Sequence, residues 1–139
     1  MRFVDSNVFI YAFLRPRRRL ERHEAEIKEA AKRIVLRLED GEEASTTVVH
    51  LSEVANLLEA RMSLGESREL LSSMVTLKGL KVVDVGGGDY SAAIQASGAL
   101  GVGVNDCLAY LVMRERGIGE IYSFDKHFDE MDGVHRVVG

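Results

Sequence analysis

The chain has 139 residues, of which 46% are hydrophobic and 29% charged, and its formal net charge is −4. This length is enough for one domain with a hydrophobic core and too short for two, and the net negative charge argues against a general nucleic-acid coat. No apolar run approaches the ~18 residues of a membrane span, Asp5 and Asn7 interrupt the only apolar run near the N-terminus, and Cys107 is the only cysteine, so we expect a single cytoplasmic domain over residues 1–139 with no membrane segment, no disulfide and no thiolate metal cluster.

The first segment predicts a strand followed directly by a helix. Residues 1–4 favour a buried strand, and apolar side chains recur at helical spacing over residues 8–13. Ser6 and Asn7 between them both favour helix N-caps. Asp5 therefore stands at the carboxyl end of the first strand, facing a helix start. In an open parallel sheet, that edge is where ligands bind.

Half of the basic residues lie close together after this helix. Pro16 ends the helix, an amphipathic helix over residues 27–38 follows, and nine of the 18 lysines and arginines fall between Arg15 and Arg37. One interpretation is a solvated helix face, as most charge runs are. The other is a patch that binds phosphates, or an acidic segment of a partner, beside an acidic site.

The rest of the chain alternates strands with helices. The predicted strands are 44–47, 80–85, 120–124 and 134–138, and the predicted helices are 51–62, 67–77, 89–99 and 108–116, with a short turn or helix at 126–129. Gly86–Gly88 is interpreted as a turn, since it lacks the spacing of nucleotide-binding glycine loops. This alternation predicts an α/β fold with a mostly parallel sheet and helices on both faces.

Four acidic residues stand out by position, namely Asp5, Glu53, Asp106 and Asp125. Each has an ordinary explanation alone, since Asp5 and Asp106 suit N-caps, Glu53 suits a surface helix and Asp125 suits a turn. A parallel sheet would nevertheless gather them in one crevice. Carboxylates packed together raise each other's pKa unless cations neutralise them. Oxygen ligands of this kind suit hard ions such as Mg²⁺ or Mn²⁺.

Other reactive side chains give weaker signals. The four histidines are scattered and no His/Cys set has zinc spacing. His127 lies near Asp125 in sequence, and we interpret it as structural or as a surface residue. Cys107 has no His–Asp partners nearby in sequence, which favours a packed thiol over a nucleophile.

The order and spacing of four short segments resemble the four motifs of PIN-domain proteins. The segments are Asp5-Ser6-Asn7 after a short strand, Ser52-Glu53 in a helix, Asn105-Asp106 opening an apolar helix with Ala109, and Ser123-Phe124-Asp125 at a strand end. The size of the chain, and the placement of the motifs over nearly all of it, are similar to the VapC-type toxins of toxin–antitoxin pairs. Two departures are Cys107 where the family often has alanine after the third-motif aspartate, and a heavier basic run from Arg15 to Arg22.

The resemblance implies a PIN-like α/β/α sandwich with a central mostly parallel sheet, and Mg²⁺- or Mn²⁺-dependent endoribonuclease activity. It also implies an RNA substrate, a VapB-like antitoxin that holds the enzyme inactive, and a homodimer. The acidic residues that would carry over as the catalytic and metal-binding set are Asp5, Glu53, Asp106 and Asp125. Those that match supporting positions are Ser6, Asn7 and Ser123, with Asp129 as a possible outer acidic member.

We hypothesise that Asp5, Asp106 and Asp125 hold one metal ion, with Glu53 near a second ion or the attacking water. Hydrolysis would then leave a 5′-phosphate and a 3′-hydroxyl. Three rivals remain open. A haloacid-dehalogenase-like phosphatase needs a second acid where Asn7 stands, and a phospho-receiver module needs a pair of acids at the end of the first strand. A catalytically silent PIN-like binding module is the third.

Overall fold

A computed structural model, which describes all of residues 1–139, shows one five-stranded sheet with the strand order β3-β2-β1-β4-β5. The strands are β1 (Arg2–Val4), β2 (Ala44–Thr47), β3 (Leu80–Val83), β4 (Glu120–Tyr122) and β5 (His135–Val137). Every neighbouring pair is parallel, including the pair at the β5 edge. The predicted mostly parallel sheet is therefore confirmed, and all of its strands are parallel.

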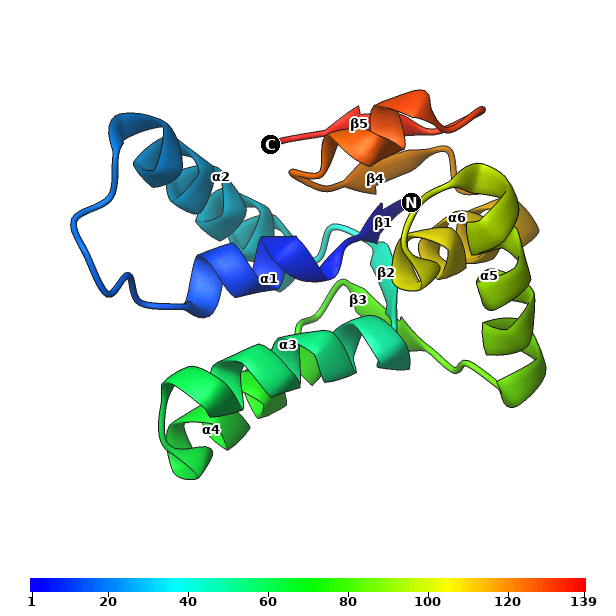
Figure 1. The fold of residues 1–139 in the computed structure, drawn as a ribbon. Helices are drawn as coiled ribbons and strands as arrows, with labels where there is room; N and C mark the ends of the chain where they lie inside the picture. Colours follow the sequence, from blue (N-terminus) through cyan, green and yellow to red (C-terminus); the bar gives the residue numbers. More distant parts are fainter.

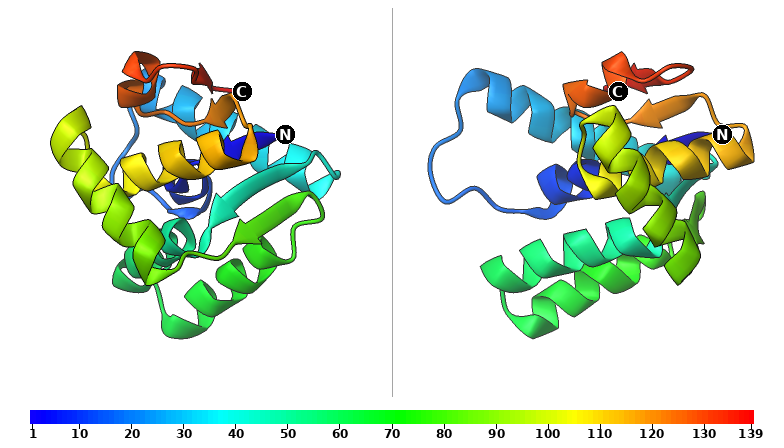
Figure 2. Two further views of the ribbon diagram at one scale, coloured as in Figure 1. Left: turned by 90° about the vertical axis from the view of Figure 1, so that its right-hand side faces the viewer. Right: turned by 45° about the vertical axis from the view of Figure 1, so that its right-hand side comes forward.

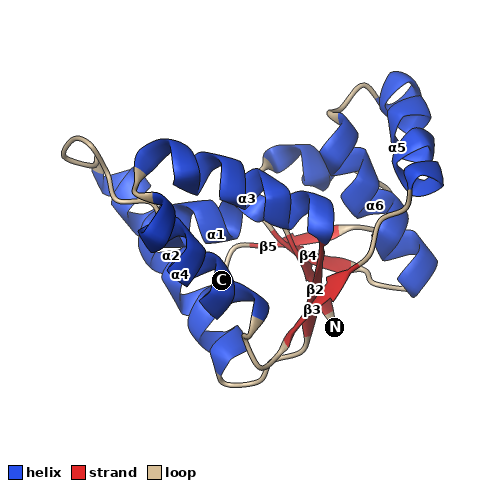
Figure 3. Cartoon of the chain, turned by 90° about the horizontal axis from the view of Figure 1, so that it is seen from below, coloured by secondary structure: helices blue, strands red, loops and turns tan.

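Helices cover both faces of the sheet, as predicted (Figure 1). They are α1 (Ser6–Phe13), α2 (Arg22–Glu39), α3 (Val48–Arg61), α4 (Leu64–Val75), α5 (Gly87–Leu100) and α6 (Val104–Arg116), with a 3-10 helix η1 at Lys126–Glu130. Helices α1 to α4 pack on one face, and α5, α6 and η1 pack on the other (Figure 3). No single helix is long and apolar enough to span a membrane, and only α5 and α6 taken together, bent by 108°, have the necessary length and composition.

Two hydrophobic cores, one on each face, fix the sandwich. Successive residues of a strand point to opposite faces, and the fully buried Phe3 and Val4 divide in this way. Val4 packs with the layer of α1 to α4, including Ile34 and Leu58. Phe3 packs with α6 and η1, where Leu108, Met113 and Phe128 are the largest fully buried side chains. The short strand β1 thereby anchors both layers, although it has three residues.

The strand order places the carboxyl ends of β1 and β4 beside each other at a topological switch point. The chain runs from β1 through β2 to β3 on one side, then returns to the other side of β1 for β4 and β5. Phe3 pairs with Ile121, so the residues that follow β1 and β4 meet at one edge (Figure 2). Crevices at such points are where ligands bind in open α/β sheets. The first and fourth predicted motifs flank this crevice.

Two helix starts differ from the sequence prediction. The N-cap of α1 is Asp5 itself, whose side chain accepts from the Ser6 backbone N–H, and neither Ser6 nor Asn7 has this role. Helix α5 begins two residues before Asp89, whose carboxylate accepts from the Gly86 N–H in a capping arrangement. In both places several consecutive residues suit a cap, and tertiary packing decides which of them is used.

The basic stretch is largely engaged within the protein. Its ion pairs are Arg18–Glu24, Arg22–Glu26 and Lys32–Glu29. The Lys28 ammonium donates to the carbonyls of Tyr11 and Leu14, which closes the C-terminal end of α1. The exposed loop over residues 15–19 follows this end, about 12 Å of helix away from Asp5.

The opposite, amino edge of the sheet carries a cluster of paired charges, which we call the amino-edge cluster. Its members are Arg2, Arg37, Glu42, Glu120 and the hydroxyl of Tyr122. Arg2 contacts both glutamates, at 3.8 Å for Glu42 and 3.4 Å for Glu120. The Tyr122 hydroxyl accepts from Arg2 and donates to Glu42 at 2.6 Å. Cations and anions are therefore matched within this cluster.

Candidate active site

Asp5 is the most deeply buried carboxylate of the crevice, with 4% of its surface exposed. Its Oδ1 accepts from the Ser6 backbone N–H at 2.8 Å and its Oδ2 accepts from the Ser123 hydroxyl at 2.7 Å. Burial raises the pKa of Asp5 to about 7, and the charges of Asp106 and Glu53 add to this while the hydrogen bonds oppose it. Such a carboxylate is held in a position where its own charge is disfavoured.

The Ser123 hydroxyl connects the ends of β1 and β4. It donates to Asp5 and accepts from the Asp125 backbone N–H at 3.0 Å and from the Asn7 amide at 3.4 Å. The Asn7 side-chain oxygen in turn accepts from the Phe124 N–H at 3.3 Å. These polar side chains therefore lock the two strand ends together and fix the position of the carboxylates that follow.

Glu53 reaches the same crevice from α3. The Ser6 hydroxyl donates to Glu53 at 3.1 Å and lies 3.5 Å from Asp5. Helix α3 starts directly after β2, with Thr47 as its N-cap, so Glu53 lies in its second turn. Ser6 thus links the carboxylates of two different helix starts through one hydroxyl group.

Asp106 is in the first turn of α6, where Gly103 is the N-cap. Burial raises the pKa of Asp106, the neighbouring Asp125 and Glu53 add to the effect, and His127 opposes it. Asp106 is therefore not the N-cap of its helix, and its side chain lies among the other carboxylates. We call the set of Asp5, Glu53, Asp106 and Asp125 the carboxylate centre.

His127 completes the open side of the centre. Its Nδ1 lies 3.1 Å from Asp125 Oδ1 and 3.8 Å from Asp106 Oδ2. One ligand atom from each of these three side chains lies within 4.8 Å of the others. From the sequence, His127 is interpreted as structural or as a surface residue, and its side chain is indeed 60% exposed. Its place beside two of the carboxylates is an addition, for which its position two residues after Asp125 was the available signal. The Asp125 side chain also caps η1 by accepting from the His127 N–H.

Asp129 lies outside this group. Its two carboxylate oxygens accept from Arg136 at 2.9 and 3.0 Å, and this pairing lowers the pKa of Asp129. Arg136 also donates to the Ser123 carbonyl. Asp129 therefore supports the backbone near the crevice through Arg136.

Cys107, predicted as a packed thiol, points from α6 into the hydrophobic core, and burial raises the pKa of its thiol.

A buried histidine, unassigned by the sequence analysis, joins α3 to α6. The Nε2 of His50 lies 3.1 Å from the Asn105 carbonyl and its Nδ1 lies 2.7 Å from the Thr47 hydroxyl. Because a carbonyl only accepts, Nε2 carries the proton and Nδ1 accepts from Thr47. Burial lowers the pKa of His50 to about 4. This neutral imidazole fixes the residue immediately before Asp106.

The donor set of the centre suits a divalent cation. The four carboxylates supply oxygen atoms and have no lysine or arginine partner, and the imidazole of His127 lies within 4 Å of Asp106 and Asp125. Burial, with the charges of the neighbouring carboxylates added to it, raises the pKa values of both Asp5 and Asp106, so negative charge is disfavoured there. A bound Mg²⁺ or Mn²⁺ would supply that compensation.

Comparison with known proteins gave one family and several solved structures. The PIN domain family model matches residues 2–134, whereas a search of curated proteins gave no match. The chain is similar to VapC20 of Mycobacterium tuberculosis, a toxin that cleaves the sarcin–ricin loop, with a TM-score of 0.69, 20% identity and 91% of each chain covered. It is also similar to chains of the VapBC2 complex of Rickettsia felis bound to promoter DNA, and of a toxin–antitoxin complex of Klebsiella pneumoniae. The TM-scores are 0.66 and 0.65, the identities 11% and 12%, and each covers 97% of this chain and 96% of the other.

Proposed function

Because this chain belongs to the PIN domain family, we propose that it is a divalent-metal-dependent endoribonuclease and the toxin of a VapBC-type toxin–antitoxin pair. The family supplies a nuclease fold, and the similar structures are VapC toxins or toxin–antitoxin complexes. The proposed substrate is RNA, and the proposed reaction is hydrolysis of a phosphodiester bond to a 5′-phosphate and a 3′-hydroxyl.

One observation carries this proposal, namely the uncompensated charge of the carboxylate centre. Side chains from the starts of α1, α3, α6 and η1 converge there, and burial with mutual repulsion raises the pKa of Asp5 to about 7. Structural carboxylates are normally paired, as Asp129 is with Arg136. Four that are not paired with lysine or arginine at a ligand-binding edge point to a cation that binds there.

In the proposed reaction the four carboxylates would hold Mg²⁺ or Mn²⁺, and the bound ion would supply activation of water and neutralisation of charge on the phosphate. Asp106 and Asp125, with His127, offer donor atoms at the open side of the crevice. Asp5 lies at its buried side, oriented by Ser6 and Ser123. These hydrogen bonds act before substrate arrives, so the carboxylates need no reorganisation during the reaction.

Asn7 separates this proposal from the phosphatase alternative. A haloacid-dehalogenase-like enzyme needs an acid two residues after its nucleophilic aspartate, and here Asn7 uses its amide to hold Ser123 and the Phe124 N–H. That side chain is committed to positioning the strand ends. A phosphomonoester assay is therefore the natural negative comparison for the nuclease assay.

The test is cleavage of RNA by the purified protein in the presence of Mg²⁺ or Mn²⁺, with EDTA as the metal-free control. We expect wild-type cleavage, and its loss in Asp5→Asn. The matched control is Asp84→Asn, because Asp84 also follows a strand but is exposed, and its strand β3 is separated from β1 by β2. Equal cleavage by wild type and Asp5→Asn, or hydrolysis of a phosphomonoester without RNA cleavage, would overturn the proposal.

The proposed partners are a VapB-like antitoxin and a second copy of the chain. Growth arrest on expression of the chain, relieved by co-expression of a small protein encoded immediately upstream, is the expected result for the antitoxin. A molecular mass of two chains in light scattering is the expected result for the homodimer. The basic stretch from Arg15 to Arg37 is a candidate contact for either an acidic antitoxin segment or RNA.

A further inference from the structure

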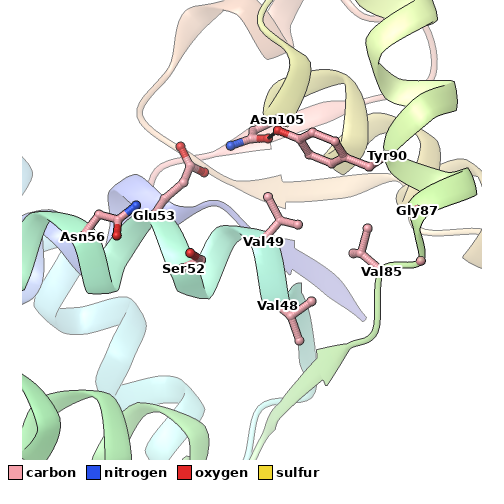
Figure 4. A pocket seen from close by; sticks show the side chains of 10 residues that line it. Val48, Val49, Ser52, Glu53, Asn56, Val85, Gly87, Tyr90 and Asn105 are labelled. Carbon is pink, nitrogen blue, oxygen red and sulfur yellow. Dashed lines mark hydrogen bonds between the residues drawn. The ribbon is translucent and has the colours of Figure 1, made fainter.

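A second cavity adjoins the carboxylate centre and shares Glu53 with it. It has a volume of about 500 Å³ and lies between α3, the loop after β3, and the first turns of α5 and α6 (Figure 4). Its lining residues are Val48, Val49, Ser52, Glu53, Asn56, Val85, Gly86, Gly87, Tyr90 and Asn105. The proposed catalytic chemistry uses only Glu53 from this list, so the rest of the cavity is unexplained.

The lining of this cavity is chemically unlike the centre. Apart from Glu53 at the shared boundary it carries no charged side chain, and its walls are the valines and the ring of Tyr90. Polar atoms come from the amides of Asn56 and Asn105 and the hydroxyl of Ser52. A phosphate or a metal ion would find no counter-charge here, whereas a flat ring with polar edges would find both apolar walls and hydrogen-bonding groups.

The walls are fixed before any ligand binds. Tyr90 donates its hydroxyl to the Asn105 side-chain oxygen at 2.8 Å, which holds the ring and leaves the amide NH₂ group of Asn105 to donate. The backbone of Asn105 is held in turn by the buried His50. Gly87 is exposed, and a Cβ added there would meet no atom within 4 Å. The cavity is thus open to solvent, with Tyr90 and Asn105 held in place in its wall.

We propose that this cavity receives the nucleobase of the nucleotide whose phosphate lies at the carboxylate centre. This inference rests on the proposed ribonuclease function and adds a specificity site to it. A nucleotide joins its phosphate and its base through one sugar, and the shared Glu53 places the two sites at neighbouring positions. Single-stranded RNA is recognised in this manner, by bases that are splayed out, stacked on aromatic side chains and hydrogen-bonded at their edges.

The experiment compares ligands with and without a base, by NMR titration of the full-length wild-type protein with Mg²⁺ present. The probes are the four nucleoside 5′-monophosphates and ribose 5-phosphate. We expect at least one nucleotide to shift the amide signals of Gly87 and Val49 and the side-chain NH₂ signals of Asn56 and Asn105. Ribose 5-phosphate should shift signals near Asp106 and leave those of the cavity in place.

A filling variant and its matched control make the test sharper. Ser52→Phe adds a ring on an exposed position of α3 that lines the cavity, and Ser73→Phe makes the same change on an exposed position of α4 outside it. The first should weaken nucleotide binding about tenfold or more and leave ribose 5-phosphate binding unchanged, while the second should alter neither. If Ser52→Phe fails to fold, Asn56→Ala is the substitute variant. This smaller change should also weaken binding of the preferred nucleotide.

Two results would overturn this inference, namely equal cavity shifts with ribose 5-phosphate and with every nucleotide, or nucleotide shifts confined to other surfaces. Neither depends on turnover, so they are separate from failure of the proposed function. Base-dependent shifts in a protein that cleaves no RNA would support the cavity and reject the nuclease. RNA cleavage without base-dependent shifts at the cavity would do the reverse.

Discussion

The two edges of the sheet collect charged side chains in opposite ways. In the amino-edge cluster, Arg2 pairs with both glutamates, and the Tyr122 hydroxyl accepts from Arg2 and Arg37 and donates to Glu42. In the carboxylate centre, acidic side chains gather without a lysine or arginine partner, and the imidazole of His127 lies beside two of them. The first arrangement is complete as it stands and supports the fold. The second leaves negative charge that a cation could neutralise, and for this reason we propose the carboxyl edge as the functional one.

The largest expected difference between the two edges is in activity. Changes in residues that hydrogen-bond to a metal ligand usually cost about 10–100-fold in activity. Asp106→Asn, which changes a proposed ligand itself, should reduce RNA cleavage by more than this. Tyr122→Phe, at the amino-edge cluster, should leave the rate unchanged. Rates measured at saturating Mn²⁺ decide this, and a comparable loss in both variants would contradict the division between the edges.

The next effect is a gain in stability on removing a carboxylate of the carboxylate centre. The folded-state pKa of Asp5, about 7, is above its ordinary value, so the folded protein binds the extra proton. Ionisation of Asp5 therefore costs no folding stability below about pH 4, and the free energy of unfolding that it removes grows as the pH rises to about 7. Asp5→Asn should raise the free energy of unfolding at pH 8 in EDTA by on the order of 2–4 kcal/mol.

Urea denaturation of both proteins from pH 5 to 8 measures this gain. The difference in the free energy of unfolding between wild type and Asp5→Asn should grow with pH. The contribution of His50 is the same in both proteins and cancels in this difference. That histidine acts in the opposite direction, since its lowered pKa removes stability as the pH falls from about 6.5 to about 4. A difference that does not change with pH would show that folding does not raise the pKa of Asp5.

Divalent ions should restore the folding stability that burial and repulsion of the carboxylates remove at the carboxyl edge. At an ion concentration one hundred times its dissociation constant, stabilisation should reach about 2.7 kcal/mol. Thermal unfolding with Mn²⁺ should show a shift in wild type and in Tyr122→Phe, and little or none in Asp106→Asn. An equal shift in all three proteins would place the ion elsewhere.

At the amino edge the expected change in stability is smaller, and it is a loss, as is usual when a hydrogen-bonding group is removed. Tyr122→Phe removes a hydroxyl that accepts from Arg2 and donates to Glu42. Both partners are partly exposed and regain water, so the loss should be about 1 kcal/mol. Urea denaturation measures it, and the loss should be the same with and without Mn²⁺. A Mn²⁺-dependent loss would mean that the two edges are coupled.

The smallest expected effect concerns which ion is preferred. Imidazole nitrogen suits Mn²⁺ better than Mg²⁺, which prefers oxygen and water. His127→Ala should therefore weaken Mn²⁺ binding several-fold, by less than about tenfold, and leave Mg²⁺ binding nearly unchanged. Calorimetric titration with each ion measures this. Equal losses for both ions would assign His127 a purely electrostatic role.

Much of this arrangement could be anticipated from strand and helix periodicity. The alternation of the two periods predicts the parallel sheet, and Asp5 and Asp125 could be placed at strand ends by counting residues. Local sequence could not decide that Asp5 would cap α1, because Ser6 and Asn7 suit the same role and the bond from Ser123 comes from 118 residues away. The assignment of the four carboxylates as metal ligands stays a prediction.

Other features depend on contacts between segments far apart in the chain. The neutral cavity is formed by Asn56 and Asn105, which no local pattern connects, and the orientation of Tyr90 depends on its bond to Asn105. The same holds for His50, which has no signal in sequence beyond an apolar neighbourhood and is fully buried between two helices. Tertiary packing selects these neighbours, so only the fold reveals them.

The pairing of β1 with β4 also has a consequence during synthesis of the chain. The hydrogen bond between Asp5 and Ser123 joins residues 118 positions apart, and β4 becomes available only after the 119 residues that precede it have been made. The N-terminal segments can gather earlier, but the crevice lacks Asp125 and His127 until then. A nuclease built in this order has no complete centre while its first four helices and three strands are being assembled.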